Sequence, residues 1–161
     1  MAIYYLKFAG ELSNVTDLQP LDDQSNPYEY IFKVTCTSCH ETHPKAVSIN
    51  RFESYDIGDS KGKANFVFRC RMCKKESSAN IDRTVAKYTV EDDSKLVPIL
   101  QIDARGLDLS DFVAEGRFEC KGLNSGTTFN EVDLSDGEWY DYDDKVSEEV
   151  SVTEIKWEIS R

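Results

Sequence analysis

Apolar and polar side chains alternate along much of this chain with a period of two residues. Alternate positions from Tyr28 to Cys36 are apolar, with polar residues between most of them. The same alternation recurs at small or apolar positions in four further segments: Phe66, Phe68 and Cys70; Leu100, Ile102 and Ala104; Ala114, Gly116, Phe118 and Cys120; Val150 and Val152. Because successive side chains of a strand point to opposite faces, this period predicts β-strands. The sequence therefore predicts an all-β fold with little helix.

The apolar phase changes near the C-terminus. Val150 and Val152 share one phase, whereas Ile155 and Trp157 share the other. One extra residue in a strand produces such a change, so we expect a β-bulge at Thr153-Glu154.

Four short segments of the first half have similar counterparts, in the same order, in the second half. Residues 14–18 resemble 108–112, the strand ending at Cys36 resembles the strand ending at Cys120, 52–56 resemble 139–143, and 66–70 resemble 155–159. We therefore predict an internal duplication in a single domain of residues 1–161. Its halves, approximately 1–94 and 95–161, would be related by a pseudo-twofold axis and share the core of one sandwich-like or barrel-like unit.

Composition and charge narrow the class of protein. The chain has 161 residues, with 30 acidic and 19 basic side chains and a net charge of −11. Such a surface repels the phosphates of nucleic acids and anionic lipids. The sequence contains no apolar run that could cross a bilayer and no basic-then-apolar leader. We expect a cytoplasmic protein, with a nuclear location also compatible, and no membrane association.

The chemistry of the chain is concentrated in two pairs of cysteines. They are Cys36-Thr-Ser-Cys39 and Cys70-Arg-Met-Cys73. Four thiolates suit zinc, and a two-residue spacing lets one turn direct both sulfurs of a pair to the same ion. We predict one structural Zn²⁺ per chain, held by Cys36, Cys39, Cys70 and Cys73 in the N-terminal half. In the predicted duplication, Cys120, Leu123 and Ile159 correspond to Cys36, Cys39 and Cys70, so the second half lacks the metal.

Other chemistry is disfavoured at this site. His40 and His43 follow the first pair, but four sulfurs already fill a tetrahedral shell, so we expect both histidines around the site or at the surface. A full shell also leaves no position for a water nucleophile, and a thioredoxin-like redox pair would need a βαβ context. We therefore expect no enzymatic activity. We interpret Cys120 as a small, buried hydrophobic residue, and a reactive thiol is the alternative.

Basic residues gather near both pairs: Arg69, Arg71, Lys74 and Lys75 near the second, and Lys33 and Lys45 near the first. Two interpretations stay open, because these cations either offset the charge of the thiolates or are solvated strand residues.

Residues 131–149 form an acidic segment, with nine acidic residues and one lysine interleaved with Trp139, Tyr140 and Tyr142. Three interpretations stay open. The segment is a solvated loop whose aromatic residues are anchored inward, a calcium site without the EF-hand pattern, or a docking strip for a basic partner.

The whole chain resembles the eukaryotic CXXC motif-containing zinc-binding protein family. The cysteine pairs alone are common to many zinc ribbons, and later segments make the match specific: Arg105-Gly-Leu107, Ser125-Gly-Thr-Thr-Phe129 and Trp139-Tyr-Asp-Tyr-Asp143. The resemblance implies a small soluble β-rich monomer with pseudo-twofold symmetry. It also implies one zinc held by the four cysteines and no established enzymatic activity.

Three functions follow as candidates. The first is a non-catalytic adaptor whose zinc is structural and whose partner is another protein. The second is metal handling, in which the cysteines transfer or buffer zinc or copper. The third is nucleic-acid binding, which the net charge of −11 disfavours.

Overall fold

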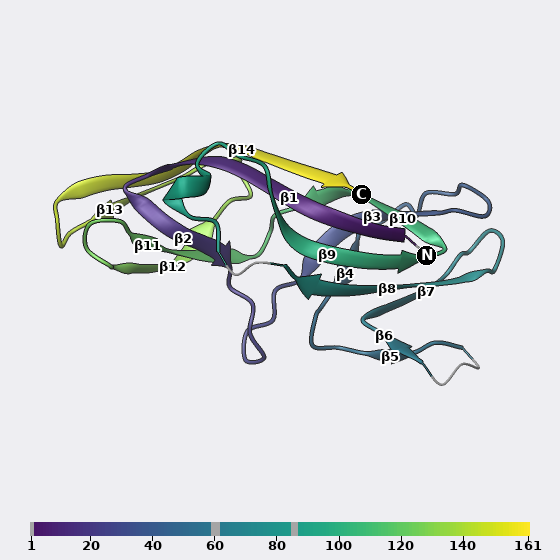
Figure 1. Ribbon diagram of the computed structural model, residues 1–161. Coiled ribbons are helices and arrows are strands. Elements are labelled where there is room, and N and C mark those ends of the chain that lie inside the picture. Colours follow the sequence, from purple (N-terminus) through teal and green to yellow (C-terminus); the bar gives the residue numbers. More distant parts are fainter. Residues whose placement is uncertain (1, 59–61, 85–86) are drawn as a thin grey trace.

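The described residues of this computed structural model, 2–58, 62–84 and 87–161, form antiparallel β-sheets and one short 3₁₀ helix, η1 (Val90–Asp92) (Figure 1). The strands are β1 (Ala2–Ser13), β2 (Val15–Pro20), β3 (Tyr30–Cys36), β4 (Val47–Ile49), β5 (Tyr55–Asp56), β6 (Lys63–Ala64), β7 (Phe66–Arg69), β8 (Glu76–Arg83), β9 (Val97–Arg105), β10 (Leu107–Val113), β11 (Arg117–Gly122), β12 (Thr128–Asp133), β13 (Trp139–Asp143) and β14 (Glu148–Ser160). These residues contain no α-helix, which confirms the predicted all-β class. None of their helical turns is long and apolar enough to span a bilayer.

A curled six-stranded sheet forms the centre of the fold, in the order β13-β14-β1-β9-β8-β7 (Figure 1). At its middle, Leu6 on β1 lies opposite Leu100 on β9. Both side chains are fully buried, together with Ile102. The most apolar strands therefore occupy the middle of the sheet, where both neighbours shield them from water.

Two long chain segments leave this sheet at residues with positive φ. β1 bends at Asn14 (φ 59°) into β2, and β9 bends at Gly106 (φ 82°) into β10. Asn and Gly tolerate the left-handed backbone conformation, which turns the strand out of the sheet. β2 then joins β11 and β12, β10 joins β3 and β4, and β5 pairs with β6.

The core follows the predicted alternation. On β3, Tyr30, Phe32, Val34 and Cys36 are all buried, and the residues between them are at least partly exposed. Trp157 on β14 joins the sheets, because its ring centroid lies 4.8 Å from those of both Phe8 and Phe112.

The predicted bulge is confirmed. Ala9 lies opposite Lys156 and Glu11 lies opposite Thr153, so Gly10 faces two residues of β14 instead of one. One of these, Glu154, has a φ of 52°. The extra residue explains the change of apolar phase along β14.

Two sequence interpretations need correction. The predicted fourth strand begins only at Arg117, because the Gly116 N–H donates to the Tyr28 hydroxyl (3.3 Å). Residues 66–70 and 155–159 are not equivalent, since β7 is an edge strand and β14 lies between β13 and β1. The duplication, the symmetry and the domain boundaries stay predictions.

Candidate metal centre

The four cysteines lie in two turns with the same backbone hydrogen bonds. In turn 36–40, the His40 N–H donates to the Cys36 carbonyl (2.9 Å). In turn 70–74, the Lys74 N–H donates to the Cys70 carbonyl (2.9 Å). His40 (φ 63°) and Lys74 (φ 65°) both take the left-handed conformation that reverses the chain. We call these segments the zinc-side turns.

The sulfur atoms form a compact cluster. The Sγ atoms of Cys36 and Cys73 are 3.7 Å apart, and those of Cys39 and Cys70 are 3.5 Å apart. All four lie within 4.8 Å of one another. With Zn–S bonds of about 2.3 Å, a tetrahedral site has S···S distances of about 3.8 Å. The four cysteines therefore suit one zinc ion.

The ligand atoms differ in exposure. Cys36 and Cys70 are 1% exposed, whereas Cys39 and Cys73 are exposed to solvent. Each pair thus offers one sulfur from the interior and one from the surface, and the candidate site lies at the edge of the core.

Backbone N–H groups favour the thiolates of the two buried cysteines. The N–H groups of Cys39 and Ser38 lower the pKa of Cys36. Those of Cys73 and Met72 lower the pKa of Cys70 to about 6. The turns therefore prepare the thiolate form that a metal requires.

Three of the six neighbouring cations contact other groups of the protein. Arg71 pairs with Glu41 (3.0 Å), and Arg69 lies 3.8 Å from the Glu76 carboxylate. Lys74 Nζ donates to the Arg71 carbonyl (2.9 Å). These contacts favour structural roles at the rim of the turns over direct contact with sulfur.

The histidines lie outside the sulfur cluster. His40 is exposed, and the ring of His43 packs edge-on against Phe68 with centroids 5.2 Å apart. His43 Nδ1 also lies 2.8 Å from the Lys45 carbonyl oxygen. Among the described residues, the metal-competent group of His, Cys, Asp and Glu side chains consists of the four cysteines.

A second pair of turns, 122–126 and 143–147, has a matching backbone but different side chains. The Gly126 N–H donates to the Gly122 carbonyl (2.9 Å), and Gly126 and Ser147 have φ angles of 72° and 54°. The buried Asp143 carboxylate accepts hydrogen bonds from the Ser125 hydroxyl and the Thr127 hydroxyl (3.0 Å). We call these segments the carboxylate-side turns.

This second pair corrects the residue correspondences expected from the sequence. Gly122 and Ser125 occupy the positions in turn 122–126 that Cys36 and Cys39 occupy in turn 36–40, where we had expected Cys120 and Leu123. Asp143 precedes the left-handed Ser147 by four residues, as Cys70 precedes Lys74, whereas we had expected Ile159 as the counterpart of Cys70. Sequence reasoning missed the cluster, although Ser125 and Asp143 both lie in segments that carry the family resemblance.

Cys120 is 1% exposed on β11, which agrees with the interpretation of a buried small hydrophobe. Burial raises its pKa to about 12. Its thiol is therefore neutral and shielded at neutral pH.

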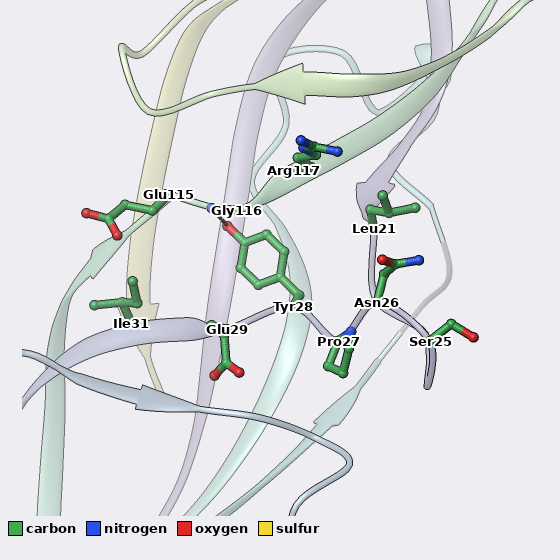
Figure 2. Close-up of a pocket in the computed structure, with 10 residues that line it drawn as sticks. All are labelled: Leu21, Ser25, Asn26, Pro27, Tyr28, Glu29, Ile31, Glu115, Gly116 and Arg117. Atoms are coloured by element: carbon green, nitrogen blue, oxygen red, sulfur yellow. Dashed lines mark hydrogen bonds between the residues drawn. The ribbon is translucent and has the colours of Figure 1, made fainter.

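A cavity of about 490 Å³ lies between segments 25–31 and 115–117 (Figure 2). The ring of Tyr28 stands at its centre, and burial raises the pKa of this hydroxyl. Two of the three charged side chains that line it contact other groups of the fold: Glu29 accepts a hydrogen bond from Asn50 (3.1 Å), and Arg117 pairs with Glu131 (3.8 Å). We therefore interpret the cavity as part of the scaffold.

The acidic segment 131–149 is not the loop that one interpretation expected, because residues 139–143 form β13. Trp139 packs inward, with its ring 5.6 Å from that of Phe129. Tyr140 and Tyr142 are 64% and 47% exposed. Inward anchoring of all three aromatic residues is therefore wrong.

Four sulfurs at tetrahedral spacing, presented by turns at the ends of β-strands, define a zinc-binding β-protein. The sequence profile described as "CXXC motif containing zinc binding protein, eukaryotic" matches residues 5–160. The chain belongs to this family.

Relatives and solved structures agree with this assignment. A UPF0587 protein of Schizosaccharomyces pombe is 38% identical over 161 residues, which cover 100% of this chain and 99% of the relative. The CXXC motif containing zinc binding protein of Bos taurus is 32% identical over 151 residues, or 93% of this chain and 92% of the relative.

Two solved structures share the fold. The crystal structure of C1orf123 has a TM-score of 0.90 at 28% identity and covers 99% of both chains. A hypothetical protein from Plasmodium falciparum has a TM-score of 0.88 at 24% identity, covering 99% of this chain and 100% of the other, and shows the fold alone.

Proposed function

We propose that Cys36, Cys39, Cys70 and Cys73 ligate one structural zinc ion in a non-catalytic protein that functions through contacts with another protein. One observation carries this proposal: the two zinc-side turns belong to different sheets. Turn 36–40 follows β3 of the β10-β3-β4 sheet, and turn 70–74 follows β7 of the six-stranded sheet. A single ion would therefore join the two sheets.

The closed ligand shell supports a structural role. Four sulfurs complete a tetrahedron and leave no coordination position for a reacting water or substrate. The metal would then stabilise the fold by joining segments that are about thirty residues apart in the sequence.

The zinc-side turns also present an apolar side chain to solvent. Met72, between Cys70 and Cys73, is 63% exposed. A flexible apolar side chain fixed on a rigid turn suits a protein-binding surface. We propose that Met72 lies in the contact with the partner.

The experiment compares Met72→Glu with Cys36→Ser in affinity capture from lysate, with zinc content and Tm measured for each variant. We expect Met72→Glu to keep zinc and Tm but lose a partner that the wild type captures. Cys36→Ser should lose zinc, Tm and partner together. An unchanged set of captured proteins for Met72→Glu, or full stability of metal-free Cys36→Ser, would contradict the proposal.

A second candidate function, transfer or buffering of metal, is favoured by the exposure of Cys39 and Cys73. An incoming ligand could reach these sulfurs first. Competition with a mild chelator separates the candidates: fast zinc loss with the fold retained supports transfer, whereas slow loss coupled to unfolding supports the structural role.

The cytoplasmic location, the monomeric state and the lack of a nucleic-acid partner stay predictions. Cell fractionation, light scattering and salt-titrated binding to single-stranded and duplex nucleic acid test them in turn.

A further inference from the structure

Among the described strands, β13 forms an open edge of the six-stranded sheet, opposite the β7 edge that leads into turn 70–74. Figure 1 shows β13 at the far end of the molecule from β5, β6 and β7. The Tyr142 N–H donates to the neighbouring Asp141 carboxylate (2.7 Å). This backbone donor is thus satisfied locally, as expected at a strand edge that faces solvent.

A groove of about 390 Å³ lies along this edge. Tyr140 lies opposite Ser151 on β14, which in turn lies opposite Ser13 on β1. All three side chains line the groove, together with Tyr142 and Glu149. Two small serines therefore form a floor beside two large, exposed tyrosines.

The charged side chains that line the groove are acidic. Asp141 and Glu149 line it, and both lie within segment 131–149, which has nine acidic residues and one lysine. Glu138 accepts a hydrogen bond from the Tyr140 hydroxyl (3.2 Å), and Glu149 lies in the groove itself. Aromatic faces surrounded by carboxylates attract cations, whereas phosphate groups are repelled.

The spacing of the tyrosines points to the shape of the ligand. Tyr140 and Tyr142 lie two residues apart on one face of β13, a separation of about 6.8 Å along a strand. Alternate residues of an extended peptide have the same separation. The guanidinium group of arginine is a planar cation that stacks on aromatic rings, and its N–H donors pair with carboxylates.

We propose that the β13 groove docks an extended peptide segment of another protein that carries arginine at alternate positions. The guanidinium groups stack on Tyr140 and Tyr142 and pair with Glu138 and Glu149. This inference goes beyond the proposed function at Met72, because it concerns a separate surface at the opposite edge of the sheet.

The test uses the zinc-loaded full chain and a fluorescein-labelled peptide, Gly-Ser-Arg-Thr-Arg-Thr-Arg-Ser-Gly, with binding followed by fluorescence anisotropy. The double variant Tyr140→Ser, Tyr142→Ser should weaken binding about tenfold, since it removes two stacking faces. The matched control is Tyr55→Ser, because Tyr55 is also exposed (50%) and bonds to a carboxylate, Glu53. It should bind the peptide as the wild type does.

A second variant, Glu138→Gln with Glu149→Gln, keeps the rings and should weaken binding in a salt-dependent way. Met72→Glu, which tests the other surface, should leave the peptide affinity unchanged. The inference is overturned if the wild type shows no saturable binding up to about 1 mM. Equal binding of a glutamate-containing peptide, equal loss in Tyr55→Ser, or unchanged affinity of the tyrosine double variant would overturn it as well.

Discussion

The zinc-side turns and the carboxylate-side turns are similar pairs of turns that are joined by different chemical groups. In turns 36–40, 70–74 and 122–126, the N–H of the fifth residue bonds to the carbonyl of the first. The fifth residue of turn 143–147, Ser147, has a similar positive φ. Both pairs lie where strands end, at opposite ends of the molecule (Figure 1). The backbone geometry is shared, and the group that joins each pair of turns is not.

The side chains explain this difference. Four thiols would repel one another as thiolates without a cation, so the zinc-side turns depend on an ion. Asp143 instead accepts hydrogen bonds from Ser125 and Thr127, and a Cβ at Gly122 would collide with both Asp143 and Ser125. The carboxylate-side turns are therefore joined by groups of the chain itself.

The largest expected effect comes from removing a zinc ligand. Cys36→Ser should lose the bound zinc and lower Tm by about 10 °C, because both sheets lose the ion that joins them. Zinc analysis and thermal unfolding measure the two effects. Cys120→Ala is the matched control and should retain one zinc per chain. A Cys36→Ser protein with full zinc content would refute the assigned ligand set.

Asp143→Asn tests the other side of the comparison. The hydroxyls of Ser125 and Thr127 lose a charged acceptor, so Tm should fall by a few degrees while zinc content stays unchanged. The exposed neighbour Asp144 supplies the control, Asp144→Asn, which should have the wild-type Tm. Zinc loss in Asp143→Asn would show that the two ends are not independent.

The pH dependence sharpens the role of Asp143. The Ser125 hydrogen bond, followed by that of Thr127, lowers the pKa of this carboxyl. A depressed native pKa stabilises the fold above the unfolded pKa of about 4, and this contribution is lost as the pH falls further. The Tm difference between wild type and Asp143→Asn should stay constant from about pH 5 to 8 and shrink below about pH 4. A difference that grows on acidification would contradict the assignment.

The smallest effect concerns the cations near the thiolates. Arg71→Ala removes a partly exposed ion pair with Glu41 and should change stability by no more than about 0.5 kcal/mol. Zinc affinity should be unchanged in a competition assay with a chromogenic chelator. A marked loss of affinity would mean that Arg71 offsets the charge of the thiolates after all.

Local patterns predicted the strands and the metal site, because both are encoded over a few residues. The alternation that ends at Cys36 fixes which face of β3 is buried, and the phase change placed the bulge at Glu154. The two-residue spacing of the cysteines likewise carries its chemistry within the motif.

The pairing of strands was not predictable in this way, because it joins distant segments. Val15 on β2 pairs with Gly122 on β11, more than a hundred residues along the chain. The hydroxyl–carboxylate cluster was missed because serine, threonine and aspartate are also ordinary surface residues. One signal was present, since Asp143 shares the inward phase of Trp139 on β13.

The most direct test of this account is hydrogen–deuterium exchange of the zinc-loaded chain and of the same chain treated with a chelator. The account predicts lost protection around turns 36–40 and 70–74 in the metal-free chain. Protection around 122–126 and 143–147 should be retained, because Asp143 joins those turns without an ion. Equal loss of protection at both pairs, or no loss at the zinc-side turns, would contradict the claim that one end of the fold depends on zinc and the other does not.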